Sequence, residues 1–142
     1  MNPKSAPQPP KDGSDKTHGS PFREQGGLKR LRKSFRCAFR GVRELFLHTP
    51  NARIHLIATI AVIGAGLYFG VSRMEWCVLV ICILLVLSLE AINSALEALA
   101  DQVTTNYAPL IRNAKDLAAG AVLIAAIGSA IIGLAILIPY IL

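Results

Sequence analysis

Three long runs of apolar residues dominate the second part of this chain. They cover residues 54–71, residues 76–89 with a helical continuation to 100, and residues 117–142. A helix needs about 20 mostly apolar residues to cross a bilayer, and each run reaches that length with its flanks. We therefore expect an all-α membrane protein, with transmembrane helices at about 52–71, 75–100 and 115–141.

The segment before these runs, from Leu28 to Leu47, has a different pattern. Apolar residues recur there at steps of three and four, and Lys and Arg fill most of the positions between them. This pattern predicts a basic amphipathic helix at about 28–47 that lies on a membrane surface. A nucleic-acid-binding helix is the competing interpretation of the same charge, and the membrane segments that follow disfavour it. We expect membrane lipids, and no nucleic acid, as partners.

Residues 1–26 are rich in Pro, Ser, Gly and charged residues, which predicts a disordered cytoplasmic tail. Residues 27–142 then form the membrane domain. The first apolar run is followed by no small-residue cleavage pattern, so we expect no cleaved signal peptide. The three cysteines have no CxxC spacing and predict neither a disulfide framework nor a zinc site.

The formal net charge of +6 is unevenly distributed, because twelve of the fifteen Lys and Arg residues lie at or before Arg53. Arg112 and Lys115 lie in the second connection between apolar runs, whereas the first connection carries only Arg73. Positive charge near membrane ends marks the cytoplasmic side. A multi-pass protein with a cytoplasmic N-terminus is therefore expected.

The stretch "LEAINSALEALAD", residues 89–101, places polar side chains at the end of the second apolar run. On a helix that turns about 100° per residue, Asn93, Glu97 and Asp101 lie within about 60° of Glu90. An ionisable group inside a membrane costs several kcal/mol unless protein, water or a partner charge faces it. The stripe is therefore a candidate functional site, with hydrogen bonding between helices as the structural alternative.

Lys115 and Asp116 follow in "NAKDLAAG", where the third membrane helix enters from the cytoplasmic side. Aligned carboxylates, an opposing lysine and an interfacial depth suit phosphoryl transfer to a lipid hydroxyl. No GxxxxGK[ST] loop is present, so a nucleotide would be held without a P-loop. An ordinary positive-inside anchor is the alternative for Lys115.

Small residues repeat every four positions in the third membrane segment, a pattern that lets another helix approach closely. The repeated small residues are Ala121, Ala125, Ser129 and Gly133. Three helices enclose little volume, which leaves open that the packing partner is another copy of the chain.

The motifs "EAINSALEALAD" and "NYAPLIRNAKDLAAGAV" closely resemble the signature of the prokaryotic diacylglycerol kinase and undecaprenol kinase family. These are small integral-membrane lipid kinases, and the resemblance extends from about Leu28 to the C-terminus. It implies a homotrimer in the bacterial inner membrane with active sites between subunits. It also implies ATP as phosphoryl donor, Mg²⁺ as cofactor, and a lipid alcohol that approaches from the bilayer.

The resemblance also implies roles for individual residues. By position, Glu90 matches the general base and contacts the substrate, Glu97 matches a metal ligand, and Asn93 matches a positioning residue. Five further positions match contacts to the nucleotide: Lys115, Asp116, Arg30, Arg40 and Tyr107. For Arg30 and Arg40, ordinary charge at the membrane surface is an even alternative. For Tyr107, the even alternative is an interfacial anchor.

One position departs from the family pattern. In "HTPNARIHL", Thr49 stands where the family usually has a second acidic metal ligand. A threonine hydroxyl is a poorer ligand for Mg²⁺ than a carboxylate, so weaker metal affinity, a compensating water or reduced activity are open consequences. We expect retained activity, because the other motif residues are present. His48 and His55 flank this segment, and interfacial hydrogen bonding is expected of both.

The substrate is either diacylglycerol or undecaprenol. Ala119 occupies a position at which the diacylglycerol branch has serine, which slightly favours undecaprenol. A non-catalytic helical scaffold, or an inactive relative disabled at Thr49, is the alternative to a kinase. A lipid phosphatase would need Arg and His phosphate-binding motifs that the chain lacks.

Overall fold

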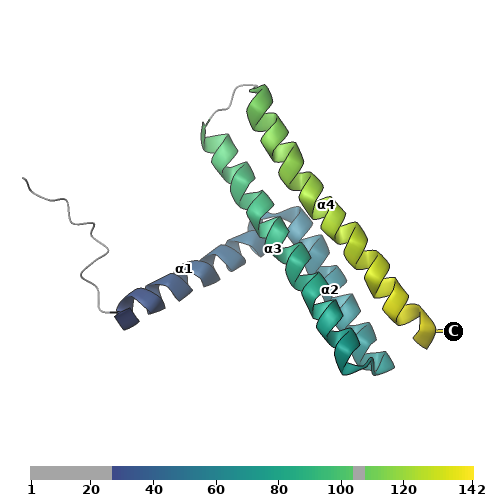
Figure 1. Ribbon diagram of the computed structural model, residues 1–142. Coiled ribbons are helices and arrows are strands. Elements are labelled where there is room, and N and C mark those ends of the chain that lie inside the picture. Colours follow the sequence, from purple (N-terminus) through teal and green to yellow (C-terminus); the bar gives the residue numbers. More distant parts are fainter. Residues whose placement is uncertain (1–26, 104–107) are drawn as a thin grey trace, which may run out of the picture. The chain divides into compact units, whose positions relative to one another are not determined.

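The computed structural model describes residues 27–103 and 108–142. Every regular element within those two ranges is helical, in the following order along the chain (Figure 1): α1 (Gly27–His48), α2 (Pro50–Phe69), α3 (Arg73–Val103), α4 (Pro109–Leu137) and the short 3-10 helix η1 (Ile138–Tyr140). Three of them, α2, α3 and α4 with η1, are long and apolar enough to cross a membrane. The expected all-α membrane fold is confirmed. The tail predicted at 1–26 lies outside the described residues.

The chain divides into two units, Met1–Phe35 and Arg36–Leu142. The described part of the first unit is the beginning of α1, where the Ser34 hydroxyl donates to the Arg30 carbonyl oxygen at 3.1 Å. Apolar and basic side chains of these turns are all exposed, as expected of an amphipathic helix whose apolar face binds a membrane surface. The second unit holds the rest of α1 and all later helices.

Two of the membrane helices begin with a proline, Pro50 in α2 and Pro109 in α4. Proline suits the first helical turn, since its φ angle is already helical and its missing N–H has no partner to lose there. For this reason α4 begins at Pro109 rather than near residue 115. Lys115 and Asp116 therefore lie inside the helix, in its second turn, instead of at its entry.

The connection between α2 and α3 is a tight turn that depends on two glycines. Gly70 ends α2 in the left-handed region with φ 65°, and its N–H bonds to the Gly66 carbonyl oxygen, as C-terminal glycines commonly do. Gly66 faces Trp76 of α3, and a Cβ atom at Gly66 would lie 2.9 Å from the indole ring. The two helices therefore approach closely where no side chain stands between them.

The corner between α1 and α2 is held by an arginine. Arg53 donates from Nε to the Phe46 carbonyl oxygen at 3.0 Å and from Nη2 to the Leu47 carbonyl oxygen. The last carbonyls of a helix lack partners within the helix and carry partial negative charge, so a guanidinium there is favourable. Arg53 thus ties the start of α2 to the end of α1.

The helices α2, α3 and α4 lie side by side, with the most extensive packing between α3 and α4 (Figure 1). The small-residue stripe of α4 contributes to it: Ala125 and Gly133 are buried, and the Ser129 hydroxyl lies 3.5 Å from the Cys82 carbonyl oxygen of α3. The stripe therefore packs, at least in part, within its own chain. Most large apolar side chains remain exposed, which suits helices solvated by lipid rather than by water.

Candidate functional site

The polar stripe predicted on the second membrane helix lies on α3. Glu90 is 1% exposed and Asn93 is 3% exposed, and they are the buried polar residues among those the structure describes. Glu97 is half-buried and Asp101 is exposed. The stripe thus passes from the interior of the helical unit to its surface within three helical turns.

Two members of the stripe bond directly to each other. The Asn93 side-chain nitrogen donates to Glu97 Oε1 at 3.3 Å, across one helical turn. This bond fixes the orientation of the amide and leaves its oxygen directed elsewhere. The carboxylate of Glu97 is in turn oriented by Asn93.

Three buried atoms of the same region have no hydrogen-bond partner among the described residues: Glu90 Oε1, Asn93 Oδ1 and Ser94 Oγ. All three belong to a little more than one helical turn of α3. Buried polar atoms are nearly always satisfied in folded proteins, because each unmade bond costs about 1–3 kcal/mol. Their clustering indicates a place where a polar group from outside this set is bound.

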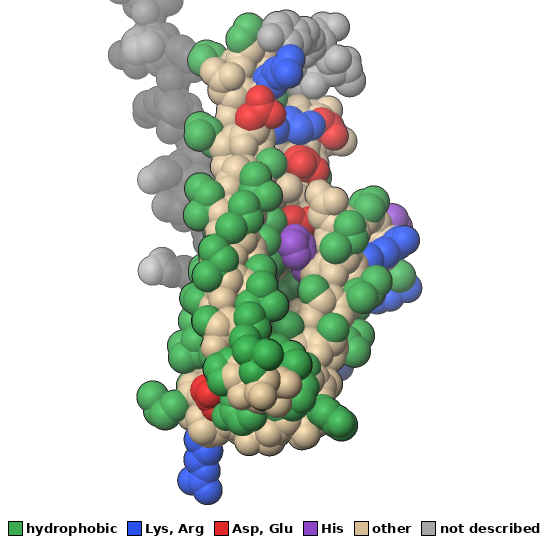
Figure 2. Space-filling model, turned by 90° about the vertical axis from the view of Figure 1, so that its right-hand side faces the viewer, with side chains coloured by type: hydrophobic (Ala, Val, Ile, Leu, Met, Phe, Trp, Pro, Cys, Tyr) green, Lys and Arg blue, Asp and Glu red, His purple; other side chains and the backbone are tan. Residues whose placement is uncertain are grey.

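A lysine reaches the stripe from α4. Lys115 Nζ lies 2.9 Å from Asp101 Oδ1, in an ion pair that joins α3 and α4, and it is close enough to Glu97 for the two charges to interact. Figure 2 shows acidic and basic side chains gathered toward one end of the helices, beside a mostly apolar surface. A cation therefore stands at the exposed end of the carboxylate stripe.

Asp116 has a different surrounding from its neighbour Lys115. Its carboxylate is 3.7 Å from Arg112 Nε, one turn earlier on α4, and both side chains are mostly exposed. Successive residues on a helix point about 100° apart. Asp116 thus pairs along its own helix, whereas Lys115 crosses to α3.

Arg40, Thr49 and Ala119 form no hydrogen bond or ion pair with the stripe within the part of the chain that the structure describes. Arg40 of α1 and Ala119 of α4 are exposed, and Arg30 is exposed within the first unit. Thr49 is the N-cap residue of α2, but its hydroxyl makes no capping hydrogen bond. Tyr107 lies outside the described residues.

A magnesium ion, which the family resemblance implies, would need oxygen ligands from this region. Within residues 27–103 and 108–142, no group of three or more His, Cys, Asp or Glu side chains is arranged to hold a metal. Mg²⁺ is commonly held by one or two carboxylates together with waters and substrate phosphates. The oriented, half-buried carboxylate of Glu97 fits a site of that kind, in which phosphate oxygens complete the coordination.

The structure gives three residues of this region a place or a partner that the sequence analysis did not assign. Asp101 shares the stripe, but its sequence separation of 14 residues from Lys115 gives no sign that the two pair. Ser94 follows Glu90 by one turn, a spacing that would have revealed it as a neighbour on the same face. His55 of α2 lies close enough to Glu90 for an electrostatic interaction, and no local sequence pattern indicates that approach.

Comparison with known proteins agrees with this architecture. The sequence model of the family "Prokaryotic diacylglycerol kinase" matches residues 36–137. The chain is 40% identical over 112 residues to the undecaprenol kinase of Bacillus subtilis, covering 79% of this chain and 91% of that protein. It is 39% identical over 131 residues to a diacylglycerol kinase of Synechocystis, covering 84% of this chain and 75% of that protein.

The diacylglycerol kinase of Escherichia coli K12 is 30% identical over 101 residues, covering 71% of this chain and 83% of that protein. The region matched by the family model contains all of α2, α3 and α4, and with them the whole polar stripe and Lys115. These matches confirm the resemblance noted in the sequence motifs. The chain belongs to the prokaryotic diacylglycerol kinase family.

Proposed function

We propose that this protein is a lipid kinase that transfers the γ-phosphoryl group of ATP to the hydroxyl of a membrane lipid alcohol. The observation that carries the proposal is the burial of Glu90, whose Oε1 atom has no hydrogen-bond partner among the described residues. A carboxylate that is buried and unpaired is costly in a membrane protein, and function is the usual reason for keeping it. Membership in a family of lipid kinases supports the same reaction.

In the proposed reaction Glu90 accepts the proton of the lipid hydroxyl. The hydroxyl oxygen forms a bond to the γ-phosphorus of ATP, the bond from that phosphorus to the bridging oxygen breaks, and ADP leaves with the electron pair. A positioned general base contributes about 100- to 10,000-fold to such a step. Positioning and charge stabilisation supply most of the rest, as in other phosphoryl transfers.

The remaining stripe residues serve the nucleotide end of the site. Asn93 holds Glu97 through the 3.3 Å hydrogen bond, and Glu97 would hold the magnesium ion together with phosphate oxygens. When bound, Mg²⁺ neutralises negative charge on the phosphates. Lys115 of α4 would bind phosphate once ATP displaces Asp101 from its ammonium group. We propose further nucleotide contacts from Asp116, Arg30, Arg40 and Tyr107.

The lipid substrate is proposed to be undecaprenol or diacylglycerol. The undecaprenol kinase of B. subtilis and the diacylglycerol kinase of Synechocystis match this chain at nearly equal identity. Ala119, at a position that carries serine in the diacylglycerol branch, favours undecaprenol by a small margin. One small side chain contributes little to the choice of a substrate with a large apolar tail.

The proposed setting is the bacterial inner membrane, with α1 on the cytoplasmic surface and the N-terminus in the cytoplasm. The concentration of Lys and Arg at or before Arg53 supports this orientation. A homotrimer with sites shared between subunits is proposed from the family resemblance. The many exposed apolar side chains of α2, α3 and α4 leave room for such contacts as well as for lipid.

The test measures phosphate transfer from labelled ATP to lipid, catalysed by purified protein in mixed micelles. The micelles contain either undecaprenol or diacylglycerol, and Mg²⁺ is titrated. We expect a labelled lipid phosphate from one of the two lipids and its loss in Glu90→Gln. Folded protein that labels neither lipid at any Mg²⁺ concentration would refute the kinase.

A second candidate function, that of an inactive structural relative, is favoured by one observation. Thr49 has replaced the usual acidic residue, and its hydroxyl is not used for capping either. If the wild-type protein is inactive and Thr49→Glu restores transfer, the chain is a disabled member of the family. If neither protein transfers phosphate, a helical scaffold is the better description.

A further inference from the structure

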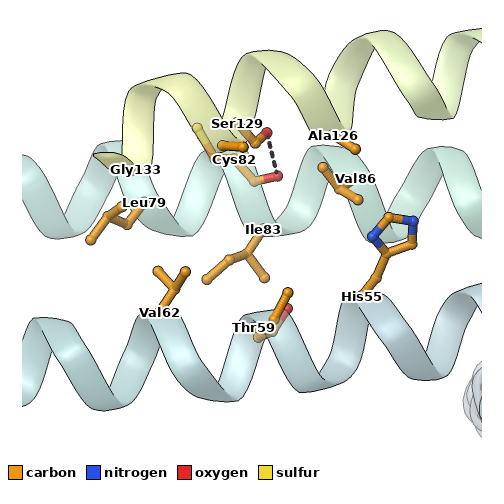
Figure 3. Close-up of a pocket in the computed structure, with 12 residues that line it drawn as sticks. His55, Thr59, Val62, Leu79, Cys82, Ile83, Val86, Ala126, Ser129 and Gly133 are labelled. Carbon is orange, nitrogen blue, oxygen red and sulfur yellow. Dashed lines mark hydrogen bonds between the residues drawn. The ribbon is translucent and has the colours of Figure 1, made fainter. Parts of the chain in front are cut away.

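His55 occupies a defined place beside the polar stripe. An apolar groove of about 250 Å³ runs between α2, α3 and α4, and His55 is the histidine among its lining residues. Figure 3 shows its imidazole ring extending from α2 toward α3, at the end of the row of labelled groove residues. The side chain is half-buried, so it is directed into the protein rather than into lipid.

The order of residues along the groove shows what His55 faces. Along α3 the labelled side chains run from Leu79 to Val86, and along α2 they run in the same direction from Val62 to His55 (Figure 3). The two helices are therefore antiparallel, and His55 lies at the level of Val86 and the turn that follows it. That following turn contains Glu90, which shares its helix face with Val86.

Two further observations agree with this register. His55 and Glu90 are close enough for an electrostatic interaction. Ala52, one turn before His55 on the same face of α2, is completely buried, so α2 packs closely against its neighbours at this level.

The carboxylate of Glu90 lacks a donor that the imidazole is able to supply. Glu90 Oε1 accepts no hydrogen bond from any described residue, and a neutral imidazole carries one N–H donor. In proteins without bound substrate, catalytic hydrogen bonds are often long and become short only in the complex.

We propose that His55 is a positioning residue that donates a hydrogen bond to the Glu90 carboxylate and orients it toward the lipid hydroxyl. The inference rests on the proposed function, since it gives the general base a partner. No proton is transferred to or from His55 in this role, because the hydroxyl proton goes to Glu90 alone. An oriented base matters, because displacing a reacting group by about 1 Å costs on the order of 100-fold in rate.

Other groups near His55 do not provide this donor. Glu97 carries only acceptors when ionised, and the Cys82 thiol is a weak donor whose residue lies on the same helix as Glu90. From α4, the groove is lined by alanines, Gly133 and Ser129, whose hydroxyl is directed to the Cys82 carbonyl oxygen. Thr59 of α2 also lines the groove with a hydroxyl, but it lies between Val62 and His55 and so further from the turn that follows Val86 (Figure 3). Among the described groove residues, His55 alone brings a side-chain N–H donor from another helix.

The test compares three substitutions of His55 in full-length protein, with lipid phosphorylation measured as kcat and as KM for ATP. His55→Gln keeps a side-chain N–H donor, His55→Leu keeps a bulky apolar group without a donor, and His55→Ala removes both. We expect kcat to fall about 10- to 100-fold in the Leu and Ala variants, to recover substantially in His55→Gln, and KM for ATP to stay unchanged. His48→Gln is the matched control, because His48 pairs with Glu44 at 2.9 Å and does not line the groove.

A purely packing role predicts the opposite order, with His55→Leu active and His55→Gln impaired, and that result would overturn the proposal. A second readout needs no activity. In protein with ¹⁵N-labelled histidine, Glu90→Gln should change the ring-nitrogen NMR signals of His55 and leave those of His48 unchanged. Unchanged His55 signals would also overturn the proposal, whereas changed signals in a protein without kinase activity would refute only the proposed function.

Discussion

Two carboxylates on α3 have opposite surroundings. Glu75, in the first turn, accepts the Ser72 backbone N–H at 2.7 Å and the Tyr140 hydroxyl at 2.7 Å, and its own N–H donates to the Ser72 hydroxyl at 3.4 Å. Glu90, four turns further on, is 1% exposed and leaves an oxygen without a partner among the described residues. The exposed carboxylate is satisfied and the buried one is not.

The difference separates a structural carboxylate from a candidate catalytic one. Ser72 and Glu75 form a reciprocal capping arrangement at the start of α3, and Tyr140 joins η1 to the same point. Glu75 Oε2 thus accepts two hydrogen bonds from within the chain, which gives this carboxylate a structural role. At Glu90 one buried carboxylate oxygen accepts no hydrogen bond from the described residues, which is why we propose that it serves the lipid hydroxyl, with His55 to orient it.

The largest effect is expected when the two carboxylates are neutralised in turn. Glu90→Gln should lower kcat for lipid phosphorylation by at least about 100-fold, because an amide cannot accept the hydroxyl proton. Glu75→Gln should leave kcat unchanged. Steady-state transfer from labelled ATP measures both, and equal losses in the two variants would contradict the distinction.

The next effect concerns the cations near each end of α3. Lys115→Met should lower kcat/KM for ATP by about 10- to 100-fold, the loss expected when a charged hydrogen bond to phosphate is removed. Arg73→Met, at the first residue of α3, should have no such effect. A similar loss in both variants would show that overall positive charge, rather than the position of Lys115, supports nucleotide binding.

A smaller effect is expected from adding a carboxylate at residue 49, where the family usually has a second acidic metal ligand. Thr49→Glu should lower the Mg²⁺ concentration for half-maximal activity by at least about threefold, since a charged oxygen is a better ligand for Mg²⁺ than a hydroxyl. Thr49→Gln introduces a side chain of nearly the same shape as glutamate but without the charge. It should leave the Mg²⁺ concentration for half-maximal activity unchanged. An identical Mg²⁺ dependence in all three proteins would place residue 49 away from the metal.

The smallest effect is expected at the satisfied carboxylate. Tyr140→Phe removes the hydroxyl that donates to Glu75, and should lower the unfolding temperature in detergent by about 1–2 °C, because the contact is exposed. Phosphoryl transfer per folded molecule should not change. Loss of activity in Tyr140→Phe would show that the two ends of α3 are coupled.

Much of the architecture is predictable from local patterns. Runs of about 20 apolar residues indicate the membrane helices, and the three- and four-residue spacing of Glu90, Asn93 and Glu97 places them on one face. Such properties depend on residues within one helix and so need no knowledge of its neighbours. The start of α4 at Pro109 was the exception, since a proline reads equally well as part of a loop or as the first residue of a helix.

Contacts between helices could not be derived in this way. The approach of His55 to Glu90 depends on the antiparallel register of α2 and α3, which the Gly66–Trp76 contact and the Gly70 turn help to set. The pairing of Lys115 with Asp101 depends on how α3 and α4 pack. Neither register is encoded in the spacing of residues along one helix.

The sequence by itself determined the helical membrane class, the family and the residues of the polar stripe, because hydrophobic periodicity and sequence motifs are properties of single segments. Tertiary structure decided which of those residues are buried, which are paired, and that a histidine from another helix lies near the proposed base. The physical reason is that burial and hydrogen bonding belong to pairs of elements. They exist only once the helices are packed.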